Sequence, residues 1–152
     1  MYGCDGKNYA FEFDGTTYVP IKTGMTTDTP DHIAAFKKHL FLSFKGGSVQ
    51  HSSTGEPIEW SAVTGASELG IGQDTTALCV TVGGTLGIFG RNGISILTGT
   101  GSSDWVLSEY STEIGAIEWS VQRLGSPIFL DDNGLTSLDA VTAYGDFKAN
   151  SL

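Results

Sequence analysis

One pattern recurs along this sequence: two short runs of strand-forming residues separated by a turn that contains glycine. The clearest copies occupy residues 39–51, 85–97 and 126–138, and a shorter copy occupies residues 8–19. Two such runs joined by a tight glycine turn predict a β-hairpin. The turn glycines of the four copies are Gly15, Gly47, Gly93 and Gly134. The dipeptides Asn92-Gly93 and Asn133-Gly134 are typical of type I′ turns, so we expect that turn type in two of the hairpins.

The resemblance between the copies extends beyond the hairpins. A further apolar run ending in a short turn precedes three of them, at residues 33–36, 78–82 and 117–121, and the three aromatic residues Trp60, Trp105 and Phe147 each follow a turn glycine by 12 or 13 residues. Units of about 40 residues with three or four strands are typical of β-propeller blades. The sequence therefore predicts an all-β, β-propeller-like fold of about three and a half to four blades of antiparallel strands.

The blade-like units are expected at about residues 1–30, 31–75, 76–115 and 116–152 of a single propeller or propeller fragment. The first unit begins without its first strand, so we interpret the chain as part of a larger propeller, the alternative being completion against a partner. A helix over residues 31–44, capped by Asp31, is the other reading of the second unit. The immediately following Gly46-Gly47 favours a strand pair there.

Charge and composition limit the classes of partner. The formal net charge is −9, with 17 acidic residues against eight Lys and Arg that do not cluster, which argues against stable binding of nucleic acid. An acidic surface still lets DNA pass without sticking. No apolar stretch approaches the length of a membrane span. Cys4 and Cys79 are expected to be free thiols, with Cys79 buried in an apolar run.

Candidate reactive residues do not combine into a known catalytic or metal-binding motif. The acidic residues near predicted loops are interpreted as a solvated surface, and the histidines lack the spacing of metal ligands; they are Glu56, Glu59, Asp104, Glu109, Glu113 and Glu118, and His32, His39 and His51. Residues 131–134 begin like a calcium loop, but a hairpin turn is preferred. We therefore expect no catalytic, cofactor-binding or metal-binding residues, and we interpret the three aromatic residues as packing between blades rather than a sugar platform.

Several segments of the sequence resemble podovirus tail nozzle or tail-hub proteins, of the tail tubular protein B and packaged-DNA stabilisation type. The similar segments are residues 40–44, 48–52, 56–60, 86–97, 115–117, 127–135 and 143–147. The resemblance implies a non-catalytic structural protein of the virion tail, made in the host cytoplasm. It also implies contacts with other copies and with neighbouring tail or portal-adaptor proteins, around a channel through which genomic DNA passes without sequence-specific binding. The alternatives are a propeller lectin, or other ligand-binding module, and a glycosidase-type propeller enzyme.

Overall fold

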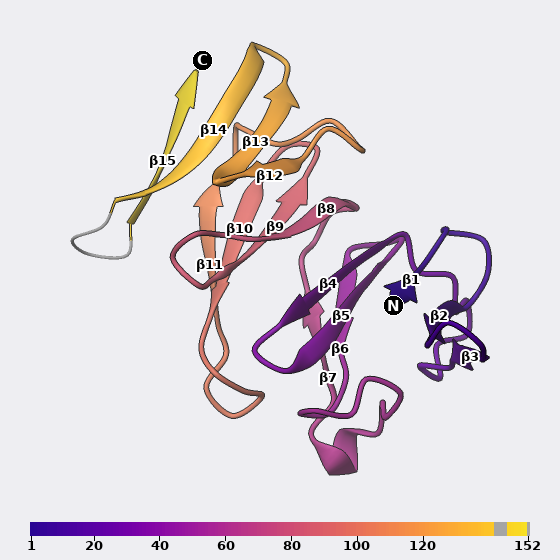
Figure 1. The fold of residues 1–152 in the computed structure, drawn as a ribbon. Helices are drawn as coiled ribbons and strands as arrows, with labels where there is room; N and C mark the ends of the chain where they lie inside the picture. The colour runs from indigo at the N-terminus through magenta and orange to yellow at the C-terminus, as the bar shows by residue number, and fades with distance from the viewer. Residues whose placement is uncertain (142–145, 152) are drawn as a thin grey trace. The chain divides into compact units, whose positions relative to one another are not determined.

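The computed structural model describes residues 1–141 and 146–151, with side chains up to Leu138. Over these residues the chain forms four small antiparallel sheets and a single turn of 3₁₀ helix, so the all-β prediction is confirmed (Figure 1). No helix in the described part is long and apolar enough to cross a membrane.

The strands of each sheet follow one another in chain order. Sheet 1 contains β1 (Tyr2–Gly3), β2 (Ala10–Phe13) and β3 (Tyr18–Ile21). Sheet 2 contains β4 (His32–Phe36), β5 (His39–Phe44), β6 (Ser48–His51) and β7 (Ser67–Gly70), with the 3₁₀ turn η1 (Ala62–Thr64) before β7. Sheet 3 contains β8 (Thr75–Val80), β9 (Leu86–Gly90), β10 (Ile94–Thr98) and β11 (Val106–Ser111). Sheet 4 contains β12 (Gln122–Leu124), β13 (Ser126–Asp131), β14 (Gly134–Val141) and β15 (Asp146–Ser151).

Each sheet is thus a meander in which every strand pairs with the next one along the chain (Figure 1). The chain divides into two compact units, each containing two sheets. Unit 1 comprises residues 1–75 and 101–103 with sheets 1 and 2, and unit 2 comprises residues 76–100 and 104–152 with sheets 3 and 4. The strand pair predicted for residues 31–44 is confirmed as β4 and β5.

The core of unit 1 lies between its two sheets. Leu40, Leu42 and Phe44 alternate along β5, so all three point to one face of sheet 2. They form one buried cluster with Ala10 of β2 and Ile21 of β3, which are paired directly across sheet 1. Burying a leucine or phenylalanine side chain contributes roughly 1.5–3 kcal/mol, so this small cluster stabilises the packing of the two sheets.

Unit 2 has an equivalent core. The rings of Phe89 on β9 and Phe129 on β13 lie 5.2 Å apart at an angle of 60°, a tilted arrangement that aromatic pairs favour. Both rings are fully buried. The other buried members of the cluster are Ile94, Ile96, Ala116 and Leu138.

An ion pair also joins the two hairpins of unit 2. Arg91 lies in the β9–β10 turn and Asp132 in the β13–β14 turn, and the guanidinium donates a hydrogen bond to the carboxylate. The two residues each stand two positions before the turn glycine of their hairpin, at Gly93 and Gly134. Equivalent positions of the repeat are therefore adjacent in space within this unit.

The predicted type I′ turns at the two Asn-Gly dipeptides are wrong. Asp131 pairs with Gly134, so the central residues of the β13–β14 turn are Asp132-Asn133, and neither has the positive φ that type I′ requires. Asp131 Oδ1 instead accepts the backbone N–H of Asn133 at 2.7 Å, a local bond that stabilises a different turn. The β9–β10 turn shows the same offset, with Arg91-Asn92 at its centre.

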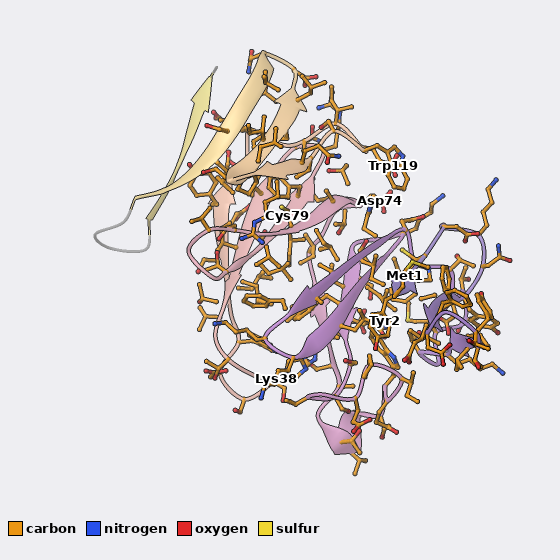
Figure 2. All side chains as sticks on the ribbon, in the orientation of Figure 1. Met1, Tyr2, Lys38, Asp74, Cys79 and Trp119 are labelled. Carbon is orange, nitrogen blue, oxygen red and sulfur yellow. The ribbon has the colours of Figure 1, made fainter. Side chains whose placement is uncertain are left out.

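Positive φ at both central residues occurs instead in the β4–β5 hairpin. Phe36 pairs with His39, which leaves Lys37 and Lys38 as a two-residue turn with φ values of 48° and 63°. This is the φ pattern of a type I′ turn, formed here by two residues that disfavour it (Figure 2 labels Lys38). The Lys37 ammonium lies 5.8 Å from the centre of the Phe36 ring, within cation–π range.

The apolar run at residues 117–121, predicted as a strand, is a turn followed by the short strand β12. Ser120 donates its hydroxyl to Ile117 O at 2.6 Å, and its Oγ accepts the Leu130 N–H at 3.2 Å. Trp119, between them, has a φ of 67°. The serine side chain therefore closes a turn where hydrophobicity alone predicts an extended segment.

Candidate functional site

A buried polar network surrounds two histidines of sheet 2. His39 begins β5 and His51 ends β6, and their rings lie 4.8 Å apart, edge to face. Both side chains are almost fully buried. The Nδ1 atoms lie 2.6 Å and 2.9 Å from the same acceptor, the backbone carbonyl of Ser52. Because a carbonyl can only accept, both Nδ1 atoms carry hydrogen.

Hydroxyl groups bind the opposite nitrogens of these rings. Ser67 Oγ of β7 lies 2.7 Å from His51 Nε2, and Thr54 Oγ1 lies 3.2 Å from His39 Nε2. Burial lowers the pKa of His51 below its ordinary 6.5, and the neighbouring His39 lowers it further. In the neutral ring, His51 Nε2 accepts a hydrogen bond from the Ser67 hydroxyl, which links β7 to β6.

A small hollow of about 170 Å³ adjoins this network, lined by His51, Trp60, Ser67 and Glu68 together with Gln50, Ala62 and Ala66. The half-buried Trp60 packs against the core cluster of unit 1, and its indole N–H donates to Pro57 O at 2.9 Å. The Glu68 carboxylate accepts the Ser48 hydroxyl at 2.6 Å. An aromatic side wall with amide and carboxylate groups beside it is the chemistry that could contact a sugar.

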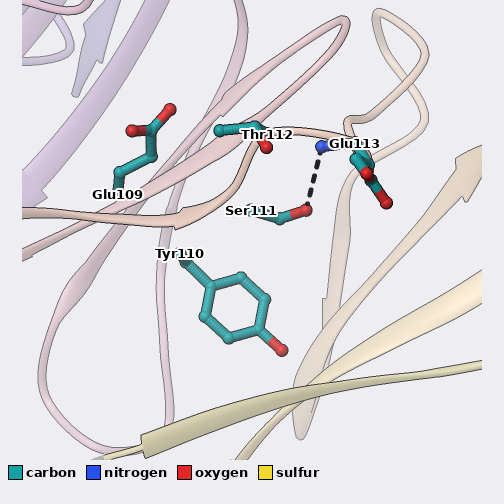
Figure 3. Close-up of a pocket in the computed structure, with 5 residues that line it drawn as sticks. All are labelled: Glu109, Tyr110, Ser111, Thr112 and Glu113. Atoms are coloured by element: carbon teal, nitrogen blue, oxygen red, sulfur yellow. Dashed lines mark hydrogen bonds between the residues drawn. The ribbon is translucent and has the colours of Figure 1, made fainter.

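A second hollow, of about 330 Å³, lies at the end of β11 and is lined by the five consecutive residues from Glu109 to Glu113 (Figure 3). The Glu113 backbone N–H donates to Ser111 Oγ at 3.2 Å. In Figure 3 the carboxylates of Glu109 and Glu113 lie at opposite ends of this stretch and point in different directions. The hollow therefore does not present two converging acids of the kind that glycoside cleavage uses.

Several aspartates have local structural partners, among them Asp104 and Asp131, which the sequence offers as candidates for chemistry. Asp131 accepts the hydroxyl of Thr136 at 3.1 Å, in addition to its bond within the turn, so residues 131–134 form a hairpin turn as predicted. Asp104 Oδ2 accepts the Thr100 hydroxyl at 2.8 Å. Asp14 accepts two backbone N–H groups of the β2–β3 turn. Carboxylates used in this way rigidify turns, because they satisfy backbone donors that would otherwise need water.

The four predicted turn glycines lie at hairpins, but they differ in whether the backbone conformation and the surrounding space require glycine. Gly47 has a φ of 80°, and a Cβ there would lie 2.6 Å from the backbone oxygen of Gln73. Gly15 and Gly134 also have positive φ, but the space around them is open. Gly93 is buried and has no positive φ, and its carbonyl accepts a hydrogen bond from the Gly90 N–H at 2.8 Å. Only Gly47 thus combines left-handed backbone with a close backbone neighbour.

The three aromatic residues that share a spacing in the sequence occupy different places in their sheets. Trp60 lies in the long β6–β7 connection, whereas Trp105 directly precedes β11. Trp105 is half-buried and lies close to Gly99, where a Cβ would meet its ring at 2.9 Å. Phe147 is the second residue of β15, and its side chain lies outside the described residues. Their role in packing between blades stays a prediction.

Neither thiol is paired in the structure. Cys4 and Cys79 are free, and both are half-buried, so Cys79 is less buried than predicted. Burial raises the pKa of Cys4 to about 11, and the nearby Asp31 and Asp5 carboxylates contribute. Within the described part of the chain, no group of three or more His, Cys, Asp and Glu residues could hold a metal ion.

The histidine network is the feature that sequence inspection missed. The contact between Ser67 and His51 could not be predicted, because a long loop and a 3₁₀ turn separate the two residues in the sequence. The available signal was the pairing of His39 and His51 at the outer ends of one predicted hairpin. No protein-family model matches the sequence, and no curated protein matches it.

Proposed function

We propose that the four sheets are consecutive blades of a β-propeller and that the chain is a non-catalytic structural component of a bacteriophage tail. The observation that carries the first part is the order of the strands. Each sheet is a chain-order antiparallel meander, and three of the four have the four strands of a propeller blade. The contact between equivalent turn residues Arg91 and Asp132 is what neighbouring copies of a repeat would make.

A role in the wall of a tail is supported by the resemblance of several segments to nozzle and tail-hub proteins. It is also consistent with the charge of the chain, since a formal net charge of −9 repels a DNA backbone and allows it to slide past. The aspartates that brace turns, among them Asp14, Asp104 and Asp131, favour stiff loops. Stiff loops suit a protein whose task is to keep a shape while a polymer moves past it.

The experiment that tests this function is localisation in the virion. Particles of the phage that encodes the chain are purified, disassembled into heads and tails, and analysed by quantitative mass spectrometry. The proposal expects peptides of this chain in the tail fraction, at a fixed ratio to the other tail proteins, and gold-labelled antibody at the tail of intact particles. Absence from purified particles, with abundant protein in the infected cell, would overturn it.

A second candidate function, glycan binding, is favoured by the hollow beside Trp60. The two readings differ in what Trp60→Ala should do. In the structural reading, Trp60 matters because it packs against the core of unit 1. Trp60→Ala should therefore lower the free energy of unfolding by about 2–4 kcal/mol, measured by urea denaturation. Trp60→Phe, which keeps an aromatic ring, should cost less than half as much.

The glycan-binding reading expects a different result from the same variants. Wild-type protein would bind a defined group of sugars on a glycan array. Trp60→Ala would lose that binding while retaining its unfolding midpoint, because a sugar platform contributes to recognition more than to the core. A folded Trp60→Ala variant with lost sugar binding would therefore favour the lectin over the tail component.

A further inference from the structure

Ser67 and His51 form a hydrogen-bonded pair for which the proposed structural role has no use. The two residues lie opposite each other in the antiparallel pairing of β6 and β7, and Ser67 Oγ lies 2.7 Å from His51 Nε2. The other ring nitrogen, Nδ1, lies 2.9 Å from the backbone carbonyl of Ser52. Because that carbonyl accepts a hydrogen bond, Nδ1 carries the hydrogen, and Nε2 presents a lone pair to the serine hydroxyl.

This arrangement is one that activates a serine for nucleophilic attack. A serine hydroxyl is a weak nucleophile, because its proton must leave as the oxygen attacks. A neutral imidazole within about 2.6–3.2 Å takes that proton, provided that a third group holds the ring in the correct tautomer. His51 Nε2 is the base in this structure, and the Ser52 carbonyl is the third group.

The surroundings of His51 favour the neutral form of its ring. The side chain is fully buried, and burial lowers its pKa below the ordinary value of 6.5. The titratable group that faces it is His39 of β5, whose ring lies 4.8 Å away and which lowers the pKa of His51 further. From β7 it is faced by the Ser67 hydroxyl, and from the following loop by the Ser52 carbonyl. Near neutral pH the ring is therefore uncharged and able to accept a proton.

The serine is accessible, although its histidine partner is buried. Ser67 is an exposed residue at the start of β7, which is the terminal strand of sheet 2. The hollow of about 170 Å³ described above is lined by both members of the pair and by the apolar side chains of Trp60, Ala62 and Ala66. A hollow of this size and lining suits a short acyl chain. An electrophile can therefore reach the serine oxygen from solvent.

We propose that Ser67 is an acylation site, which accepts a short acyl group from an activated donor such as an aryl ester or a thioester. Ser67 Oγ attacks the carbonyl carbon of the donor and passes its proton to His51 Nε2. The bond from that carbon to the phenolate or thiolate breaks, the leaving group takes the proton from His51, and an ester remains on Ser67. Each chain accepts one acyl group, so the modification is stoichiometric and compatible with a non-catalytic structural role, on which it does not depend.

Labelling of the full chain with a fluorophosphonate tests for an activated serine. The reagent phosphonylates the serine oxygen with loss of fluoride, and peptide mass spectrometry gives the position and the rate. Ser67→Ala should lose the label, and His51→Gln should slow it roughly 100-fold or more, the usual size of a general-base contribution. The matched control is Ser108→Ala, which removes an exposed serine from β11, the terminal strand of sheet 3, whose strands contain no histidine. This variant should be labelled at Ser67 at the wild-type rate.

Acyl transfer itself is measured with p-nitrophenyl acetate. Release of one nitrophenolate per chain gives the rate, and mass spectrometry locates the acetyl group on Ser67. The rate should rise with pH as His51 loses its proton and should level off above 6.5, because the folded pKa lies below that value. A serine without a base would depend on hydroxide, and its rate would continue to rise about tenfold per pH unit.

Ser67→Cys keeps His51 in place and decides the case in which His51→Gln disturbs the fold. Its new thiol should react with iodoacetamide at pH 6 at least about tenfold faster than the new thiol of Ser108→Cys, because an adjacent imidazole favours the thiolate. Equal alkylation at the two positions, or labelling of Ser67 no faster than labelling of Ser108, would overturn the proposal and leave the hydrogen bond a purely structural role. None of these measurements depends on whether the chain is found in phage tails.

Discussion

Gly47, in the β5–β6 turn, is a residue at which backbone geometry strongly limits the sequence. Gly47→Ala should lower the free energy of unfolding by more than 3 kcal/mol, because it adds a clash with the Gln73 backbone to the roughly 1–2 kcal/mol of left-handed strain. The neighbouring Gly46→Ala is the matched control, since Gly46 also has positive φ but open space around it. Urea denaturation of both variants measures the difference. Equal losses at the two positions would contradict this account of Gly47.

His51 should make stability depend on pH. Its pKa is lowered in the folded state, so the unfolded chain takes up a proton near the ordinary value of 6.5 while the folded chain resists it. The free energy of unfolding should therefore fall as the pH is lowered through 6.5 towards the folded pKa. The pKa values of Asp5 and Asp14 lie below 3.8, so their effects belong to a more acid range.

Denaturation at a series of pH values between 8 and 5 measures this dependence. His51→Gln should flatten the slope in that range, whatever it does to the absolute stability. An unchanged slope in the variant would mean that another group takes up the proton. Ser67→Ala should keep part of the slope, because it removes the hydroxyl partner of His51 and leaves the ring buried.

At the scale of elements, the β4–β5 hairpin has a turn that its sequence disfavours. Replacing Lys37-Lys38 by Asn-Gly should stabilise the protein by about 1–2 kcal/mol, because these residues accept positive φ readily. The lost cation–π contact with Phe36 offsets part of this gain. Thermal denaturation of the double variant checks the direction. A lower midpoint would show that the two lysines serve the fold in a way that the φ values do not reveal.

The hairpins could be predicted from the alternation of apolar residues and the position of glycine, because both are local properties of the chain. The predictions that were wrong concern turns in which a side chain bonds to nearby backbone. The bond from the Asn133 N–H to Asp131 places the β13–β14 turn one residue earlier than predicted. The Ser120 hydroxyl bonds to Ile117 O and closes a turn where the apolar run predicts a strand. The histidine network was beyond prediction for a different reason, since it joins β5, β6 and β7 through Ser52 and Ser67. Contacts across a long loop leave no periodic pattern in the sequence.

At the scale of the whole molecule, the proposed propeller requires the four similar sheets to behave as one structural body. Within each unit, the sheets pack through matched alternating faces, and a turn-to-turn ion pair joins the hairpins of unit 2. A propeller requires that the two units also form one rigid assembly, because its blades surround a common axis. Two independent modules joined by a linker would keep every contact described within the units and still not form a propeller.

Nitrogen-15 relaxation of backbone amides is the most direct test of this claim. The measurement is repeated at several protein concentrations and extrapolated to infinite dilution. The propeller predicts that amides of unit 1 and unit 2 report one rotational correlation time, as expected for a rigid body of 16.0 kDa. Two different and shorter correlation times, one for each unit, would contradict it.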